Sequence, residues 1–441
     1  METLKKLIPA KWLNWLRPYY HGFLGWAAGL YYGQPSEALI VVGVTGTVGK
    51  STTVALLARI LNFNGHLTGY ITTVDFFDGK TQFMNKRGLS MSNEITLQKQ
   101  LQVMAARGCK YAIVECTSEG LAQNRHAGIN FDVALFTNLS HAHVEAHGSY
   151  GNYQAAKGRL FAALSAHRRK IFFPQKMLGV NFDDPISGYF LSFAADKKFG
   201  VSFKNVQVAD AQKVFHASPK AAEQPIEFSL DNTPMSLNLL GEFNVKNAAL
   251  AAACANMLGV GLEEAAAALK DFRGVRGRME QVANRLGLKI IVDYGCEPES
   301  FKSAAEAAAQ LSHQRLIHVF GTTGGHRDKQ KRFEFGKISA QYADYIIITN
   351  DDVYDSDPQE IANKTEIGIQ SFKLRKPQYE IILDRRAAIA RALALAQKGD
   401  LVLITGKGSE QFLVLPGNKR IEWDEVAVVE QELAKISLSS L

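Results

Sequence analysis

The chain has 441 residues, which is too long for one compact core and indicates roughly three domains at about 150 residues each. Hydrophobic residues make up 46% and charged residues 21%, so the composition excludes a disordered or low-complexity protein. Fifty Lys plus Arg against 43 Asp plus Glu give a net charge of +7, but no basic run is long enough to follow a nucleic-acid backbone. We therefore expect anionic ligands and no nucleic acid.

Cysteine usage and hydropathy indicate the compartment. The four cysteines lie far apart and form no Cys-x-x-Cys pair, so neither a zinc site nor a disulfide framework is expected. No run reaches about 18 apolar residues, and the N-terminus lacks the apolar region of a signal peptide. These features predict a cytoplasmic protein.

Residues 1–37 form an aromatic N-terminal segment that also carries four basic residues. Pro9, Pro18 and Pro35 are expected to divide it into short pieces. The simplest interpretation is one or two helices that pack their aromatic side chains against the next domain. Peripheral contact with a membrane interface is the alternative, because such interfaces favour aromatic and basic side chains. We expect packing with a secondary role in binding the acceptor, because helices broken at Pro9 and Pro18 present a poor continuous amphipathic face.

From residue 38 onward apolar strands alternate with helical segments, which predicts a largely parallel sheet covered on both faces. The first half has expected strands at 39–42, 111–114 and 133–136, expected helices at 51–63 and 245–258, and antiparallel strands at 226–230 and 236–239. A Gly- and Arg-rich hinge at 273–278 marks a domain boundary. Beyond it, strands are expected at 289–292, 316–320, 345–349 and 400–405. The last third is therefore a second α/β domain.

A phosphate-binding loop is predicted between the first strand and the first helix, where the chain reads Gly-Val-Thr-Gly-Thr-Val-Gly-Lys-Ser from Gly43. The glycines let backbone N–H groups turn toward phosphate oxygens, and the positive end of the following helix adds to the attraction. Lys50 is expected to reach the β- and γ-phosphates of ATP, and Ser51 to bind Mg²⁺. The predicted nucleotide-binding residues of this loop are Thr45, Gly46, Thr47, Gly49, Lys50, Ser51 and Thr52.

The residues around this loop, Val44-Thr45-Gly46-Thr47, resemble the opening of the Mur ligase family. These are ATP-dependent amide ligases that build peptidoglycan stem peptides, and the resemblance is strongest to the tripeptide-forming MurE branch. It continues to about residue 415. The resemblance implies a central P-loop ATPase domain with a parallel sheet at 38–277 and a C-terminal, Rossmann-like α/β domain at 278–441 that binds the amino acid.

Three downstream residues match the family's metal site in order and spacing. Glu115 ends a strand where the family has a metal-binding glutamate, and His143 ends a Thr-Asn-Leu stretch where it has a metal-binding histidine. Lys157 stands where carbon dioxide converts a family lysine into a carbamate, an anion that helps to hold Mg²⁺. The resemblance therefore implies catalytic roles for Lys50, Glu115, His143 and Lys157, and two Mg²⁺ held by Ser51, Glu115, His143 and the carbamate on Lys157.

The resemblance also implies that nucleotide binding spans both domains. Asn244 and Asn247 match asparagines that lie against adenine in the family. In the C-terminal domain Arg278 is expected on the phosphates and Asp293 on the ribose. Closure of the domains then excludes water from an acyl-phosphate that would otherwise hydrolyse.

The predicted amino-acid site lies in the C-terminal domain. Arg327 matches a family arginine that contacts the α-carboxylate of the incoming amino acid. Glu410 matches a family glutamate that contacts the distal ammonium of the same amino acid. Diaminopimelate-adding members have Asp-Asn-Pro-Arg where this chain has Asp-Asp-Val-Tyr at 351–354. Without that arginine, the second carboxylate of diaminopimelate has no partner. The amino acid is therefore expected to be lysine or another cationic diamino acid. The substrate-binding residues so implied are Arg327, Asp351, Asp352, Tyr354, Gly406 and Glu410.

These features predict a monomeric ATP- and Mg²⁺-dependent ligase that adds an amino acid to the terminal carboxylate of a peptidoglycan-precursor peptide through an acyl-phosphate. The carrier of this muropeptide-type acceptor stays open between a UDP-linked, a lipid-linked and another form, because MurE members usually place a UDP-binding domain before the phosphate loop, where this chain has the aromatic segment.

Three alternatives stay open: a ligase adding glutamate to folate or to a polymer, a P-loop switch or transport ATPase, and a non-catalytic scaffold. The set of Glu115, His143 and Lys157 favours a ligase over the last two, which have no need of it.

Overall fold

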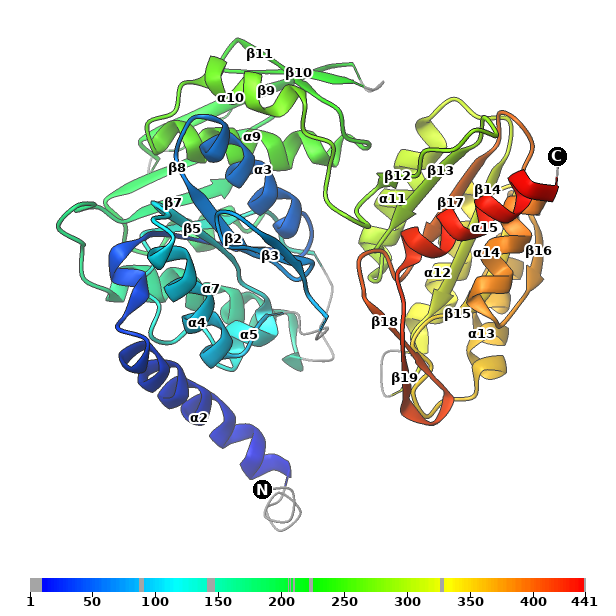
Figure 1. The fold of residues 1–441 in the computed structure, drawn as a ribbon, viewed down its shortest axis with the longest axis horizontal. Helices are drawn as coiled ribbons and strands as arrows, with labels where there is room; N and C mark the ends of the chain where they lie inside the picture. Colours follow the sequence, from blue (N-terminus) through cyan, green and yellow to red (C-terminus); the bar gives the residue numbers. More distant parts are fainter. Residues whose placement is uncertain are drawn as a thin grey trace.

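The computed structural model describes residues 10–86, 91–140, 147–204, 206, 208, 211–221, 225–325 and 329–439. It has two α/β lobes, one built on an eleven-stranded sheet and the other on a six-stranded sheet (Figure 1). The predicted α/β class with two sheets is therefore confirmed. None of the described helices is both long and apolar enough to span a bilayer.

The larger sheet has a parallel centre and antiparallel ends. Its strands are β1 (Ile40–Thr45), β2 (Thr68–Ile71), β3 (Asp75–Phe77), β4 (Gln82–Met84), β5 (Tyr111–Glu115), β6 (Val133–Phe136), β7 (Met177–Asn181), β8 (Lys197–Ser202), β9 (Lys213–Ala221), β10 (Ile226–Leu230) and β11 (Thr233–Leu237). They lie in the order β11-β10-β9-β8-β7-β6-β1-β5-β2-β3-β4. The run from β9 to β2 is parallel, whereas β10 and β11 at one end and β3 and β4 at the other pair antiparallel.

Helices cover both faces of this sheet. One face packs against α3 (Lys50–Phe63), α9 (Phe243–Met257) and α10 (Leu262–Lys270), and the other against α4 (Glu94–Ala106), α5 (Ser118–Ala122), α7 (Tyr150–Ala166) and α8 (Ser187–Leu191). The alanine-rich α9 is buried along most of its length, because small side chains let it fit between the sheet and α3. β1 is buried at every position, as expected for a central parallel strand.

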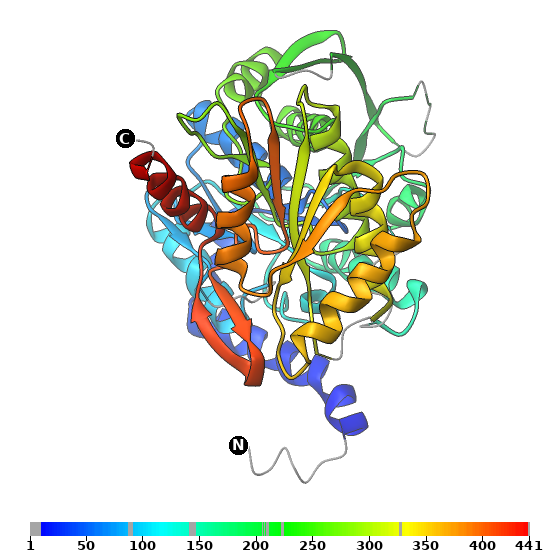
Figure 2. The ribbon, with the colours of Figure 1, turned by 90° about the vertical axis from the view of Figure 1, so that its right-hand side faces the viewer.

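The smaller sheet has the order β12-β13-β17-β14-β15-β16, and only β12 is antiparallel to its neighbour. Its strands are β12 (Glu280–Gln281), β13 (Lys289–Asp293), β14 (Leu316–Thr322), β15 (Tyr345–Asn350), β16 (Gln378–Ile381) and β17 (Leu401–Thr405). One face packs against α11 (Pro298–Gln310), α12 (Lys329–Tyr342) and α13 (Pro358–Ser371), and the other against α14 (Arg385–Leu395) and α15 (Glu425–Ser439). Figure 2 looks onto this lobe, with the hairpin of β18 (Phe412–Leu415) and β19 (Lys419–Glu422) beside it.

The predicted strands match β1, β5, β6, β13, β14, β15 and β17 within a few residues, and the predicted antiparallel pair matches β10 and β11. The two predicted helices match α3 and α9.

The N-terminal segment differs from expectation. Helix α2 (Ala10–Tyr31) runs without interruption through Pro18, so the predicted division at this proline is wrong. A proline removes one backbone donor, but contacts with the lobe offset this loss here: Asn124 donates to the Pro18 carbonyl at 3.2 Å, and His21 lies 2.8 Å from Glu94. The short helix η1 (Pro35–Ala38) then leads into β1.

Candidate active site

The carboxyl ends of neighbouring parallel strands bring the predicted site residues of the first lobe together. Thr45 ends β1, Glu115 ends β5, and Thr137 directly follows β6. β1 pairs with both β5 and β6, so these three ends lie at one edge of the sheet. Ligands of open α/β sheets bind at this edge.

The phosphate loop is a backbone cradle with no room for side chains at two glycines. Gly46 and Gly49 have φ of +155° and +83°. A Cβ on Gly46 would lie 1.9 Å from the Thr137 hydroxyl, and one on Gly49 would lie 2.2 Å from the Asn247 side-chain oxygen. Asn138 holds the loop from behind by accepting from the backbone of Val48 at 3.0 Å. The cradle opens α3, so its shape and dipole fit the phosphates of ATP.

A hydroxyl and a carboxylate meet at the start of α3. The Ser51 hydroxyl donates to Glu115 at 2.7 Å, and the backbone N–H of Thr73 donates to the same carboxylate oxygen at 2.9 Å. Both Ser51 and Glu115 are buried. Mg²⁺ prefers hard oxygen ligands of this kind, so the pair fits the ion.

Two lysines converge on the cradle. Lys50 donates to the carbonyl of Thr47 at 2.7 Å, and Lys157 of α7 donates to the carbonyl of Gly46 at 2.6 Å. Burial lowers the pKa of both ammonium groups, and the nearby Lys50 charge holds the pKa of Lys157 further below its ordinary value. A lowered pKa keeps part of Lys157 in the neutral amine form, which is the form that reacts with carbon dioxide.

Two predicted residues, His143 and Arg327, lie outside the described residues. Another histidine, His147, does lie beside the site: its Nε2 is 3.1 Å from the Ser118 hydroxyl, and its ring is 5.2 Å from that of Tyr153. Burial and the charge of Lys157 lower the pKa of His147, which favours its neutral form.

The predicted adenine residues lie next to the cradle. Asn244 and Asn247 are buried in the first turns of α9, where the Asn247 amide donates to the Asn244 side chain at 3.0 Å. The Asn244 amide donates to the carbonyl of Leu240 at 2.7 Å. Part of their hydrogen-bonding capacity is therefore structural, and their contact with adenine stays a prediction.

Arg278, before β12, and Asp293, at the end of β13, lie at the start of the second lobe. Asp293 accepts from the backbone of Met279 at 2.9 Å and of Gly295 at 2.8 Å, so it holds two segments together. Arg278 lies 4.3 Å above the ring of Tyr294, and its charge lowers the pKa of Lys50. The predicted phosphate contact of Arg278 and ribose contact of Asp293 stay predictions.

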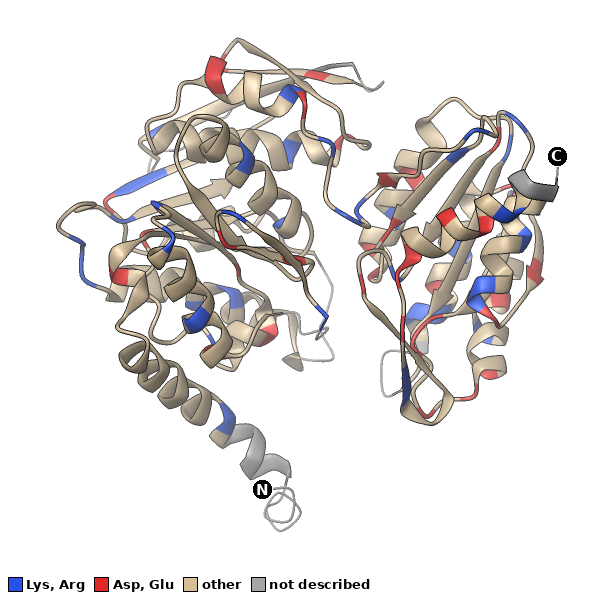
Figure 3. Ribbon diagram, viewed as in Figure 1, with Lys and Arg blue, Asp and Glu red and all other residues tan. Residues whose placement is uncertain are grey.

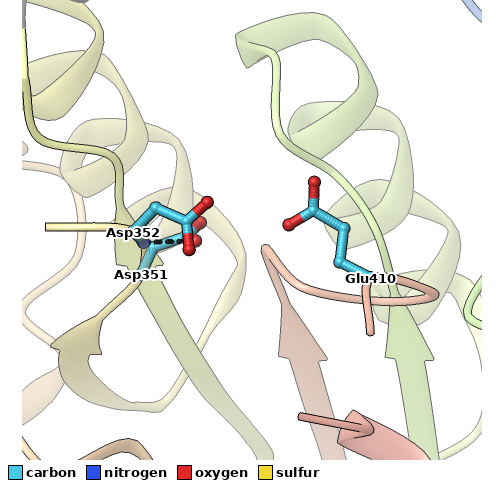
Figure 4. A group of neighbouring side chains, drawn as sticks. All are labelled: Asp351, Asp352 and Glu410. Atoms are coloured by element: carbon cyan, nitrogen blue, oxygen red, sulfur yellow. Dashed lines mark hydrogen bonds between the residues drawn. The ribbon is translucent and has the colours of Figure 1, made fainter. Parts of the chain in front are cut away.

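A second cluster lies at the carboxyl ends of β15 and β17. Asp351 and Asp352 follow β15 and face Glu410 from the loop after β17, with carboxylate oxygens within 4.8 Å of one another (Figure 4). The Tyr294 hydroxyl donates to Glu410 at 3.1 Å. Tyr294 therefore joins the cluster to Arg278, whose guanidinium lies over the Tyr294 ring.

Lys407 is fully buried inside this cluster. Its ammonium donates to Asp352 at 2.8 Å and to Glu410, and lies 3.5 Å from Asp351. Burial lowers the pKa of Lys407, but the three carboxylates outweigh burial and raise it above its ordinary value. Burial and the two aspartates raise the pKa of Glu410, against the opposite effect of Lys407.

The remaining two predicted residues shape the edge of this cluster. Gly406 has φ of +117°, and a Cβ there would lie 3.0 Å from the Asp351 carboxylate, so glycine is favoured at this position. Tyr354 has φ of +57°, and its carbonyl accepts from the backbone of Gly417 at 3.0 Å. The Arg385 guanidinium, adjacent to Gly406, is paired with Glu425.

Sequence reasoning missed Thr73, Tyr153, Tyr294 and Lys407. Lys407 and Tyr294 stand inside stretches that the sequence analysis recognised. The sequence did not indicate which side chains they contact. Tyr153 also stands in a recognised stretch, before Lys157, but its contact with Thr47 arises only in the folded chain. Thr73 carries no local signal, because only the folded chain brings it to Glu115.

The shape of the cradle predicts the effect of Gly49→Ala. The new methyl group would overlap Asn247, so we expect ATP affinity to fall at least about a hundredfold, with a stability loss of about 1–3 kcal/mol. Gly65→Ala at the other end of α3 is the matched control, because Gly65 has φ of +76° with no atom near its Cβ position. Equal ATP affinity in the two variants, measured by calorimetry, would contradict the assignment.

Comparison with known proteins identifies the family. Residues 44–255 match the Mur ligase middle domain, and residues 277–408 match the Mur ligase glutamate ligase domain. The UDP-N-acetylmuramyl-tripeptide synthetase of Roseiflexus sp. (strain RS-1) is 35% identical over 93% of this chain and 81% of its own. The UDP-N-acetylmuramoyl-L-alanyl-D-glutamate--2,6-diaminopimelate ligase of Geobacillus kaustophilus is 34% identical over 91% and 80%.

Solved structures of Mur ligases are similar to this chain. One of a UDP-N-acetylmuramoyl-L-alanyl-D-glutamate--2,6-diaminopimelate ligase has a TM-score of 0.60 and 27% identity over 90% of this chain and 79% of that one. MurF from Thermotoga maritima in complex with ADP has a TM-score of 0.65 over 96% and 85%, and at 17% identity it shows a shared fold. The chain therefore belongs to the Mur ligase family of ATP- and Mg²⁺-dependent amide ligases, and it is of MurE type.

Proposed function

We propose that this chain joins lysine, or another amino acid with a distal ammonium, to the terminal carboxylate of a peptidoglycan-precursor peptide through an acyl-phosphate. The observation that carries the proposal is the acidic cluster of Asp351, Asp352 and Glu410, where three carboxylates surround the single ammonium of Lys407. A ligase of this kind requires a site for a cationic amino acid as well as a site for phosphates.

The charge of the cluster supports a cationic side chain. The three carboxylates share one ammonium, that of Lys407. The neighbouring Arg385 does not neutralise them further, because it is paired with Glu425. The cluster therefore has an excess of negative charge before any substrate binds. A distal ammonium would balance it, whereas a second carboxylate, as in diaminopimelate, would meet like charges.

The same charge argues against a glutamate-adding ligase. Glutamate would bring a side-chain carboxylate toward Glu410 and the two aspartates, with Lys407 already shared among them. No described residue of the cluster supplies a second cation free of such a partner. We therefore keep the glutamate ligase as a rival that the substrate comparison below tests.

We propose that Ser51 and Glu115 hold one Mg²⁺, and that Glu115, His143 and a carbamate on Lys157 hold a second. Bound Mg²⁺ neutralises charge that develops on the transferred phosphoryl group. Lys157 supports this assignment because it is buried, lies at the cradle and has a lowered pKa. The adjacent ring of Tyr153, 4.5 Å from the Lys157 ammonium, keeps the amine oriented toward Gly46.

We also propose that residues 38–277 and 278–441 act as two domains that close over the nucleotide, with Arg278 on its phosphates and Asp293 on its ribose. Arg278 directly follows this boundary and already influences Lys50, which supports a role that joins the two halves. The proposed acceptor is a muropeptide, and its carrier stays open between UDP, a lipid and another form.

Competition between amino acids tests the proposal. In a ligation assay with muropeptide acceptor, we expect kcat/KM for lysine to exceed that for diaminopimelate and for glutamate by about a hundredfold, because a misplaced carboxylate near like charges costs several kcal/mol. Glu410→Gln should remove most of this preference by raising the KM for lysine. Glu360→Gln is a matched control, since Glu360 is an exposed glutamate on α13. A preference for diaminopimelate would refute the charge argument.

A further inference from the structure

The orientation of helix α2 is the reverse of that of an ordinary surface helix. Its small residues face the lobe: Gly25, Ala28 and Gly29 are buried, and a Cβ on Gly25 would lie only 2.6 Å from the carbonyl of Ala127. Glycine at position 25 thus permits direct backbone contact with the loop at 127–128. An amphipathic helix of a soluble domain normally buries its large apolar side chains instead.

Seven large side chains in the described part of α2 are exposed. Their spacing of three and four residues places them on one side of the helix. They are between 43% and 83% exposed: Leu16, Tyr19, Tyr20, Phe23, Trp26, Leu30 and Tyr31. We call this set the outer face of α2. It corrects the expectation that these aromatics pack on the central domain, because glycines and alanine occupy the packed side.

The sequence of the segment that carries the outer face is basic. Residues 3–36 contain Lys5, Lys6, Lys11 and Arg17 and no acidic residue, and Figure 3 shows no acidic position on the described part of α2. Arg159 of α7 is exposed and lines, with Tyr19, a concavity of about 690 Å³ beside the helix. Two carboxylates of the lobe are paired, Glu94 with His21 of α2 and Glu37 with Arg168.

We propose that the outer face of α2 docks on an anionic lipid bilayer and holds the enzyme at the membrane surface. Interfacial helices combine Trp, Phe and Leu on one side with nearby Lys and Arg, and they lie in the headgroup region without crossing it. Tyr and Trp suit this region because their rings are apolar and their polar atoms reach water. α2 is anchored to the lobe by its glycine side, so docking requires no rearrangement of the fold.

Charge also favours the bilayer over a second copy of the chain. Two outer faces in contact would pair two segments of the same sign of charge, because residues 3–36 carry four basic residues and no acidic one. Like charges oppose that pairing, whereas anionic headgroups complement them. The test must therefore distinguish vesicle binding from self-association of the chain.

Vesicle sedimentation of the full chain tests the proposal. We expect sedimentation with vesicles of phosphatidylglycerol and phosphatidylcholine, little with phosphatidylcholine alone, and weakening by salt. Trp26 lies on the outer face, so tryptophan emission should shift to shorter wavelength with the anionic vesicles. Phe23→Gln/Trp26→Gln/Leu30→Gln should lower the partition coefficient at least about tenfold.

The matched control is Phe63→Gln/Ile367→Gln/Leu374→Gln, which removes three exposed apolar side chains elsewhere and should bind vesicles like the unmodified chain. Both triple variants should keep the unmodified ATP turnover in the absence of vesicles. Absence of sedimentation with anionic vesicles at low salt, or equal losses in the two triple variants, would overturn the proposal. So would a concentration-dependent dimer that the outer-face variant abolishes and that vesicles do not compete with.

Discussion

Replacing Lys50 by alanine should lower ATP turnover by about a thousandfold or more while the chain stays folded. The Lys50 ammonium is buried at the phosphate cradle, where its charge meets the transferred phosphoryl group in a site of low dielectric constant. Burial lowers its pKa, which means that the folded chain disfavours this charge. The substitution should therefore leave the melting temperature unchanged or raise it.

The control is Lys80→Ala, which removes an exposed lysine of the same lobe and should leave turnover unchanged. ADP release with saturating acceptor and amino acid gives the rate, and thermal denaturation reports the fold. Turnover of Lys50→Ala within a few-fold of the unmodified chain would show that the cradle does not bind the reacting phosphate.

Replacing Lys157 by alanine should have an effect of similar size, about a thousandfold, that a small carboxylate partly reverses. The carbamate supplies an anion at the cradle, and acetate or propionate can occupy the space that the side chain leaves. A lysine that served only packing would also lose activity on replacement, but a carboxylate would not restore it. Removal of carbon dioxide from the buffer should lower the activity of the unmodified chain reversibly.

Lys176→Ala is the comparison, because Lys176 is also buried but pairs with Asp132 away from the cradle. Its activity should not respond to acetate. Full activity of Lys157→Ala without any additive would identify Lys157 as an ordinary helix residue.

The phosphate cradle could be predicted because its signal is local. The glycines, Lys50 and Ser51 lie within nine residues between a strand and a helix, and each has a physical reason to be there. Central strands such as β1 and β17 were predictable for a related reason: they are buried on both faces and therefore continuously apolar. Edge strands such as β4 and β19 are short and largely exposed, so they have no such continuous apolar run.

The acidic cluster could be predicted only in part. Its carboxylates stand in recognisable stretches, but the pairing of Lys407 with Asp352 joins residues 55 positions apart. Whether that ammonium is buried among carboxylates or exposed to solvent depends on the packing of two strand ends. The excess of negative charge, which carries the choice of amino acid, is therefore a property of the fold.

Helix α2 was mispredicted because two general rules compete there. Proline commonly ends a helix and aromatic side chains are commonly buried, yet Pro18 lies inside α2 and its aromatics are exposed. The deciding feature is the glycine side, which gains close backbone contact with residues 127–128. The spacing of Gly22, Gly25 and Gly29 is the signal in the sequence that could have indicated this orientation.

The most direct test of the central claim is ADP release measured with each substrate omitted in turn. A ligase of this type should release ADP at its full rate only when muropeptide acceptor, lysine, ATP and Mg²⁺ are all present, and it should form one amide product per ADP. Phosphoryl transfer and amide formation are coupled because the acyl-phosphate reacts with the amine inside a closed site. ADP release at the same rate without acceptor and amino acid would contradict the account and identify an ATPase.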